Sequence, residues 1–332
     1  MTADLSLDQE GGAFGGVGIP GGGGPGVGEI AARSPWQLFW RRLKGDKVAL
    51  TALVVVVLLI VIAIFATPIT KLVGAPAYDH FDHSAQDQFG QPTGPSSRHL
   101  LGVDNHGGDV FSRTLKGAQV SLTVAVAATG ISMIIGVAVG LFAGFYRGWV
   151  DTVLSRSMDV LLAFPILLLA LGIGSACSDP KTGCLGGALK PGEGLVIAVI
   201  AFANWPYVAR LVRGQVLSLR EKEFVEAARS LGASGPRIVF REILPNLVAP
   251  IIVYASLVIP QNVLFEASLS FLGVGVQFPG ASWGDMLSNA APIFYSAWWF
   301  MLFPGLALLI TVLAFNLVGD GLQDALNPRS GR

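Results

Sequence analysis

Long apolar runs separated by shorter polar segments make up most of this chain. Six nearly uncharged runs approach or reach the ~20 residues that a membrane-spanning helix requires. They are Val48–Ala66, Val120–Tyr146, Val160–Ser178, Gly194–Ala209, Leu247–Phe265 and Trp298–Val318. The pattern therefore predicts an all-α integral membrane protein with six transmembrane helices.

Small residues and prolines within these runs indicate how the helices pack. Gly136, Gly140 and Gly144 recur at a four-residue step in the second run, which would let a neighbouring helix approach closely. Pro206 interrupts the fourth run and Pro260 the fifth. Proline is tolerated where a helix packs against protein or lines a watery path. We therefore expect a packed bundle with breaks in its fourth and fifth spans.

The composition agrees with a membrane protein and adds its orientation. Of the 332 residues, 52% are hydrophobic and 13% are charged, about half the charged fraction of a soluble domain. The net charge is zero, so no overall field favours nucleic acid as a partner. With six spans, 16 of the 22 Lys and Arg residues fall on one side. The positive-inside rule then predicts that both termini are cytoplasmic.

Five segments follow from this topology. Residues 1–34 contain a glycine-rich stretch with too few large side chains to pack into a fold. We expect them to form a disordered cytoplasmic tail. Residues 35–66 should form an interfacial helix and the first span, which starts too late and is too long for a cleavable signal peptide. An extracytoplasmic loop (67–116), a core membrane domain (117–320) and a cytoplasmic C-terminal tail (321–332) complete the chain.

Two groups of residues on the predicted outer side could bind a metal or form a covalent bond. His80 and His83 lie three apart beside acidic residues and could ligate a transition metal, but a solvated polar loop is the favoured explanation because nothing else fixes a ligand geometry. Cys177 and Cys184 share one short outer loop, which favours a disulfide over two free thiols.

Patterns for common enzyme chemistry are missing from the sequence. It contains neither a phosphate-binding P-loop nor a His-Glu-x-x-His metalloprotease pattern. Asp159 and Glu266 are the acids nearest the spans, and structural capping explains each as well as chemistry does. An enzyme is therefore not expected.

A charged hairpin interrupts the apolar second half of the chain, within the predicted loop 210–246. Phe224, Ala228 and Leu231 recur at helical spacing, and Gly232 follows as a helix-ending glycine. The pattern predicts a short cytoplasmic helix with an apolar ridge that ends at Gly232.

A second short helix should follow this glycine. Ser234 can cap its start, and Pro245 would end it. Its apolar contacts would come from Ile238, Phe240, Ile243 and Leu244. The pair of helices is typical of a docking surface. A helix that simply lies on the membrane would explain the amphipathic pattern but not the sharp glycine turn.

The hairpin sequence EAARSLGASGPRIVFREILPN resembles the EAA loop of ABC-importer permeases. The positions that match are Glu226, Ala227, Ala228, Gly232, Leu244 and Pro245. The family often has a hydrophobic residue where this chain has Glu242. The resemblance implies that this loop is a coupling helix, which docks in a groove on a separate ATPase subunit.

Further stretches resemble the second, C-type permease of dipeptide, oligopeptide and nickel importers. They include HLLGVDNHGGDVFSRTLKGAQVSL (99–122), WRRLKGDKVALTAL, EASLSFLGVG, SWGDML and NLVGDGLQDALNPR. The resemblance covers about residues 36–330. It implies the type I importer fold, with six transmembrane helices and a cytoplasmic coupling-helix hairpin.

The resemblance also implies an activity and its partners. The chain would form a heterodimeric pore with a B-type permease, receive di- or oligopeptides from an extracytoplasmic binding protein, and couple to two ATPase subunits. ATP and Mg would be bound by those ATPases, and this chain would hold no cofactor. A nickel or metal-chelate importer of the same family is the nearest alternative. An ATP-independent channel or scaffold, and more distantly a membrane-embedded hydrolase, represent other classes.

Overall fold

The computed structural model describes residues 35–179, 183–184, 187, 189–276 and 278–326. The regular elements of this part are helices, joined by loops that contain four isolated β-bridges. The expected glycine-rich tail (1–34) lies outside the described residues, as does the end of the expected C-terminal tail.

Five helices are long and apolar enough to cross a membrane, within the part of the chain that the structure describes. They are α2 (Lys47–Ile64), α4 (Val110–Phe145), α7 (Glu193–Leu219), α10 (Leu244–Phe271) and α12 (Trp298–Leu326). The third predicted span is instead divided between α5 (Trp149–Leu162) and α6 (Ile166–Ala176), which meet at 85°. The bundle therefore has six spans if this bent pair crosses the membrane as one.

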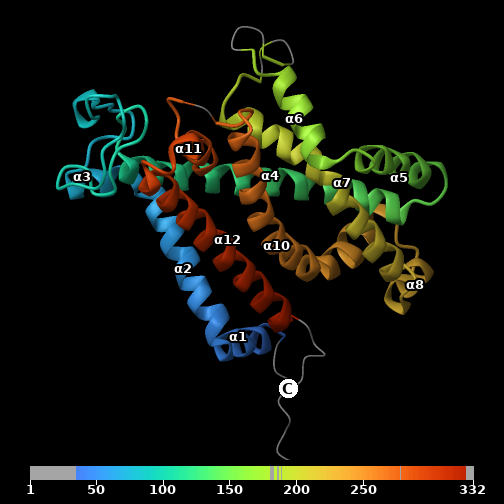
Figure 1. The fold of residues 1–332 in the computed structure, drawn as a ribbon. Coiled ribbons are helices and arrows are strands. Elements are labelled where there is room, and N and C mark those ends of the chain that lie inside the picture. Colours follow the sequence, from blue (N-terminus) through green and yellow to red (C-terminus); the bar gives the residue numbers. More distant parts are fainter. Residues whose placement is uncertain (1–34, 180–182, 185–186, 188, 277, 327–332) are drawn as a thin grey trace, which may run out of the picture.

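Short helices cap the two ends of the bundle (Figure 1). They are α1 (Pro35–Gly45), α3 (Ala66–Val73), η1 (His83–Ala85), α8 (Glu223–Ser230), α9 (Gly235–Arg237), η3 (Ile238–Ile243, a π-helix), α11 (Trp283–Ala290) and η4 (Ala291–Ile293). In Figure 1, α1 and α8 lie at the lower end, whereas α11 and the loop that precedes α4 lie at the upper end. Helix α8 therefore lies at the opposite end of the bundle from α11 and the loop that precedes α4.

Several helix boundaries differ from the prediction. Helix α4 begins at Val110, ahead of both the predicted span and the predicted core boundary at 117, because the Asp109 carboxylate caps it by accepting from the Ser112 amide at 2.8 Å. Helix α12 continues to Leu326, past the predicted start of the tail at 321. Its last turns remain helical because Ala325 is buried against Phe39 of α1.

The predicted breaks at proline are absent from the fourth and fifth spans. Pro206 lies inside α7, and Pro250 and Pro260 lie inside α10. Pro206 and Pro260 are buried, so neighbouring helices enclose the positions where backbone hydrogen bonds are missing. The helices therefore continue through these prolines.

Helices α4 and α7 form the most extensive contact in the bundle, and the glycine stripe lies in it. A Cβ atom added at Gly136 would lie 2.4 Å from the Val208 Cβ, and one at Gly144 would lie 2.7 Å from the Val216 Cβ. At Gly140 it would lie 2.7 Å from the carbonyl oxygen of Ala209. The glycines therefore allow an approach between the two backbones that no larger side chain would permit.

Candidate functional site

The polar hairpin begins with α8, which ends in a tight glycine turn. Gly232 has φ +78°, a left-handed conformation that costs a residue with a Cβ about 1–2 kcal/mol. Its amide donates to the Arg229 carbonyl at 2.9 Å, and the Ala233 amide donates to the Ala228 carbonyl at 3.0 Å. These are the two bonds of a Schellman motif. The turn thus reverses the chain while satisfying the carbonyls at the end of α8.

The second arm of the hairpin differs from the prediction. Pro245 does not end a short helix; it lies in the first turn of α10, directly after the π-helical stretch η3. The helix is continuous through this point, and the π-helical stretch before the proline accommodates its missing amide hydrogen. Ser234 precedes α9 but makes no side-chain capping bond, contrary to expectation. The hairpin's second arm is therefore the start of the fifth span, and a displacement of the hairpin would be carried directly into α10.

Buried side chains hold the hairpin against the bundle. Val225 of α8 and Ile243 of η3 are fully buried in a cluster that includes Val212 and Val216 of α7. Ile238, predicted to belong to the docking surface, is also buried in this cluster. The hairpin is therefore fixed in place by apolar packing on α7.

Arg220 adds a polar anchor that sequence reasoning missed. Its guanidinium is buried and donates to the carbonyls of Gly144 and Phe145, at 3.0 and 3.1 Å. These carbonyls close α4, where the helix dipole favours a cation. In the sequence, Arg220 was noted only as one of the Lys and Arg residues on the predicted cytoplasmic side. Arg220 thus ties the coupling segment, defined here as residues 220–244, to the end of α4.

An exposed face remains on the coupling segment. Phe224 is 38% exposed, Leu231 88% and Phe240 57%. We call these three residues the exposed apolar set. The remaining matched positions differ in exposure: Glu226, Ala227 and Pro245 are exposed, and Ala228 and Leu244 are half-buried. Large apolar side chains presented on a rigid, otherwise charged hairpin are typical of a protein-docking surface.

A buried ion pair organises the opposite end of the molecule. The Arg113 Nε lies 2.9 Å from Asp104, with both side chains almost fully buried, and one of its amino groups donates to the Gly280 carbonyl at 3.0 Å. Asp285 lies 3.9 Å away, and its burial raises the pKa of that carboxyl above the ordinary value. Arg113 therefore joins the predicted outer loop to the segment before α11.

Two tryptophans continue this contact between the loop and the bundle. The Trp299 indole donates to the Val103 carbonyl at 3.1 Å, and the Trp283 indole donates to the Thr114 carbonyl at 3.0 Å. Gly117 leaves room for Trp283, since a Cβ there would lie 2.8 Å from the indole ring. The predicted outer loop is thus a folded cap rather than a solvated connection.

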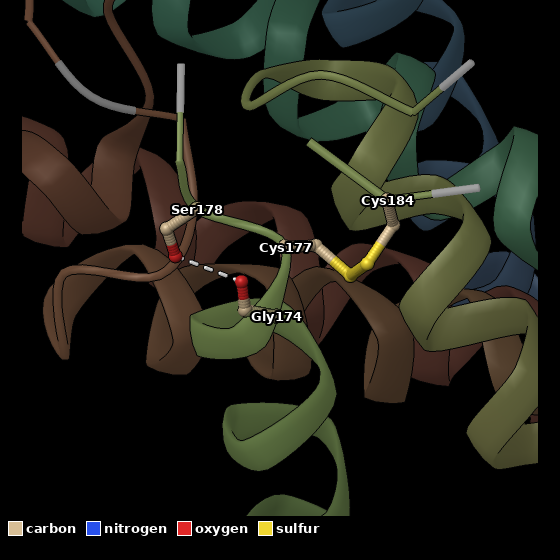
Figure 2. The surroundings of a disulfide bond; sticks show 4 residues. All are labelled: Gly174, Cys177, Ser178 and Cys184. Atoms are coloured by element: carbon tan, nitrogen blue, oxygen red, sulfur yellow. Dashed lines mark hydrogen bonds between the residues drawn. A yellow bond between two sulfur atoms is a disulfide. The ribbon is translucent and has the colours of Figure 1, made fainter. Parts of the chain in front are cut away.

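The two cysteines lie in the loop that follows α6. Cys177 and Cys184 are joined by a disulfide in the structure (Figure 2). The Ser178 hydroxyl donates to the Gly174 carbonyl at 2.8 Å and closes the end of α6 beside them. Residues 180–182 between the cysteines lie outside the described part.

The four histidines do not belong to a metal-binding group of side chains in the described part of the chain. Within the described ranges, no three His, Cys, Asp or Glu side chains are placed to hold a metal ion. The predicted candidates His80 and His83 lie in the outer cap, where the neighbouring Asp82 accepts from the Ser84 amide. His99 instead contacts Asp109 at 2.9 Å, within the cap.

The two acids near the spans have structural partners. Glu266 is fully buried in α10 and accepts from the Ser270 hydroxyl at 2.7 Å. Asp159 of α5 pairs with Arg210 of α7 at 2.6 Å on a solvent-exposed face. The Asp159 pair joins α5 to α7, whereas the Glu266 hydrogen bond lies within α10.

The bundle of five long apolar helices, or six with the bent pair, has the fold of a type I ABC importer permease. In the methionine ABC transporter MetNI, solved in inward-facing conformations, one chain superposes with a TM-score of 0.54. The superposition covers 65% of this chain and 96% of that one at 20% identity, and it therefore supports the fold alone.

Sequence comparisons identify the family. Residues 136–332 match the binding-protein-dependent transport system inner membrane component, and residues 34–91 match the N-terminal TM domain of oligopeptide transport permease C. The dipeptide transport system permease protein DppC of Alkalihalophilus pseudofirmus is 41% identical over 301 residues, covering 91% of this chain and 92% of the relative. The glutathione transport system permease protein GsiD of Pectobacterium atrosepticum is 41% identical over 305 residues, covering 92% and 95%.

The chain belongs to the family of binding-protein-dependent transport system inner membrane components. Within it, the chain is a C-type permease subunit of an ABC importer, a multi-pass protein of the cytoplasmic membrane. It is not an enzyme, because the ATPase of such importers resides in separate subunits.

Proposed function

We propose that this chain is one half of the pore of an ATP-driven importer of di- and oligopeptides. Its similarity to dipeptide and glutathione permeases over about nine-tenths of its length supports a peptide substrate. The outer side would receive the peptide from an extracytoplasmic binding protein, and a B-type permease would supply the other half of the pore.

The coupling segment is the observation that carries this proposal. It presents the exposed apolar set while buried contacts hold it against α4 and α7. We infer that two ATPase subunits, which would bind ATP and Mg, dock on the segments of the paired permeases, here through Glu226, Ala227, Ala228, Gly232, Leu244 and Pro245. Closure of the ATPases would displace each segment and, because it runs into α10, tilt the fifth span with it.

The proposed orientation places the coupling segment and both termini in the cytoplasm. Cations concentrate on the side of the hairpin, as the positive-inside rule requires of a cytoplasmic side. The disulfide loop and the Arg113 cap would then face the oxidising exterior, where a disulfide persists.

Reconstitution of the full importer tests the proposal. Vesicles that contain this chain, its partner permease, both ATPases and the binding protein are compared for uptake of labelled dipeptide, oligopeptide and nickel. We expect peptide uptake that requires both ATP and the binding protein. Nickel uptake alone would support the metal-importer alternative, and uptake without ATP would contradict a coupling role for the hairpin.

A further inference from the structure

A cavity lies among α6, α7 and α10, within the membrane-spanning part of the bundle, and Ile166, Val208, Val258 and Phe265 form its apolar lining. Its volume is about 220 Å³. The polar side chains that line it are Asn204, Tyr207, Tyr254, Gln261 and Asn262. Among its lining residues in the described part of the chain, none carries a charge. The cavity thus combines amide and phenol groups in helices that are otherwise strongly apolar.

The depth of these groups excludes a lipid-facing role. Asn204 lies near the middle of the 27-residue helix α7, and Gln261 lies within the span formed by α10. Tyr207 is 43% exposed and Gln261 is also exposed. Hydrogen-bonding groups left in hydrocarbon without partners cost several kcal/mol each. This face is therefore covered by water or protein in the membrane, not by acyl chains.

A hydrogen-bonded chain fixes the two asparagines at the cavity wall. The Asn204 side-chain nitrogen donates to the Asn262 side-chain oxygen at 3.0 Å and to the Ile200 carbonyl at 3.1 Å. Asn262 in turn donates to the Thr129 hydroxyl of α4 at 2.8 Å. Both hydrogens of the Asn204 amide are thereby used, so its carbonyl oxygen is the group left to accept a further bond.

Three other groups in the cavity are free to bind a ligand. Within the described residues, the side chains of Tyr207, Tyr254 and Gln261 make no hydrogen bond to the protein. With the Asn204 oxygen, they offer both donors and acceptors, as the amides of a peptide backbone require. The described residues that line the cavity include no imidazole, thiolate or carboxylate, the usual ligands for a divalent transition metal.

Two of the helices that line this cavity, α7 and α10, are also those nearest the coupling segment in the chain. Helix α7 ends at Leu219, directly before the segment, and α10 begins at Leu244, where the segment ends. A displacement of the segment would therefore move the two principal walls of the cavity relative to each other. A ligand held between them would be gripped or released as the ATPases close and open.

We propose that this cavity is the contact site for the peptide backbone in the translocation path. The inference rests on the proposed peptide import and deepens it. Neutral amides and phenols bind the amide groups that all peptides share, and the lack of charge leaves peptides of different side-chain charge equally acceptable. Selection among peptides would then be made by the binding protein.

Opposite charges placed at one position test this assignment. Gln261→Glu and Gln261→Lys are introduced into the complete reconstituted importer, with Gln261→Met as the neutral control. Uptake of an acidic and a basic dipeptide is measured together with ATP hydrolysis. A charge pair about 4 Å apart in water is worth about 1 kcal/mol, as attraction for one dipeptide and as repulsion for the other. The ratio of acidic to basic uptake should therefore shift by about 2 kcal/mol, or about 30-fold, in opposite directions for the two variants. Gln261→Met should leave the ratio unchanged.

Three results would overturn the assignment. The first is an unchanged uptake ratio in both charged variants, and the second is failure of both to co-purify with the partner permease, which would place this surface in the subunit interface. The same substitutions at Gln215, exposed near the end of α7 and outside the cavity, serve as matched controls. A similar shift there would also remove the assignment. Wild-type vesicles separate the two hypotheses: if they take up no peptide, the proposed function fails, whereas normal uptake with unshifted ratios rejects the cavity alone.

Discussion

The turn at Gly232 is where a single substitution should separate membrane insertion from ATPase coupling. Gly232 adopts φ +78°, and no heavy atom lies within 4 Å of the position that an added Cβ would take. The Cβ atom of a valine at this position would meet no steric obstacle from neighbouring residues. The whole effect of Gly232→Val therefore comes from the backbone conformation.

Its magnitude follows from the two ways in which the chain can respond. Holding a residue with a Cβ in the left-handed region costs about 1–2 kcal/mol, and a β-branched residue is among the least tolerant. Releasing the turn instead would break the two Schellman bonds, at about 0.5–1.5 kcal/mol each. The second response would therefore cost about 1–3 kcal/mol, and the less costly of the two sets the effect at about 1–2 kcal/mol. If this energy is drawn from the conformation that binds the ATPase, the Kd should rise about 5- to 30-fold.

A matched control lies at the other end of the bundle. Gly74 ends α3 with φ +72°, also has no atom within 4 Å of an added Cβ, and is followed by an Ala75 amide that donates to Thr70 at 3.0 Å. Gly74→Val therefore imposes the same strain away from the coupling segment. Permease pairs that carry each variant are placed in nanodiscs, and the ATPase subunit is titrated onto them.

We expect weaker ATPase binding by the Gly232→Val pair alone, with equal amounts of both variants in the membrane. Wild-type affinity for Gly232→Val would refute the argument that the glycine turn positions the docking surface. Equal weakening by Gly74→Val would show instead that strain anywhere in the chain disturbs the complex.

Three further predictions concern stability and covalent structure. Gly140→Ala should lower the melting temperature of the purified permease pair, because overpacking costs about 1–3 kcal/mol. Gly130→Ala in the same helix should not lower it, because an added Cβ there meets open space. Equal melting temperatures for the two variants would contradict the close packing of α4 on α7. Arg113→Met should lower the free energy of unfolding by about 3–5 kcal/mol, because it leaves Asp104 buried without its partner. Arg98→Met should lower it by at most about 1 kcal/mol, because the Arg98 side chain is 67% exposed. Thermal unfolding of both variants measures the difference. Cys177→Ser should expose one thiol to alkylation without prior reduction, whereas a wild-type chain that is alkylated without reduction would show that no disulfide forms.

The apolar runs and the glycine turn could be predicted from the sequence because their causes are local. A run such as Val48–Ala66 is helical and membrane-spanning by its own composition, whichever helices surround it. The end of α8 at Gly232 follows from the conformational freedom of glycine. The EAA pattern of Glu226, Ala227 and Ala228 also pointed to the coupling role, although no pattern could indicate which of these side chains are exposed.

The tertiary structure alone decided where the helices end and which polar groups work together. Pro245 would end a helix in isolation, but the π-helical stretch before it joins the hairpin to α10. Arg220 donates to Gly144 at the end of α4, 76 positions away in the chain. Asn204 donates to Asn262, 58 positions away. Local sequence carries no record of such contacts, because their free energy arises only when the helices pack. The sequence by itself therefore determined the membrane bundle and its coupling hairpin, whereas packing determined how they are joined and where a polar cavity lies between them.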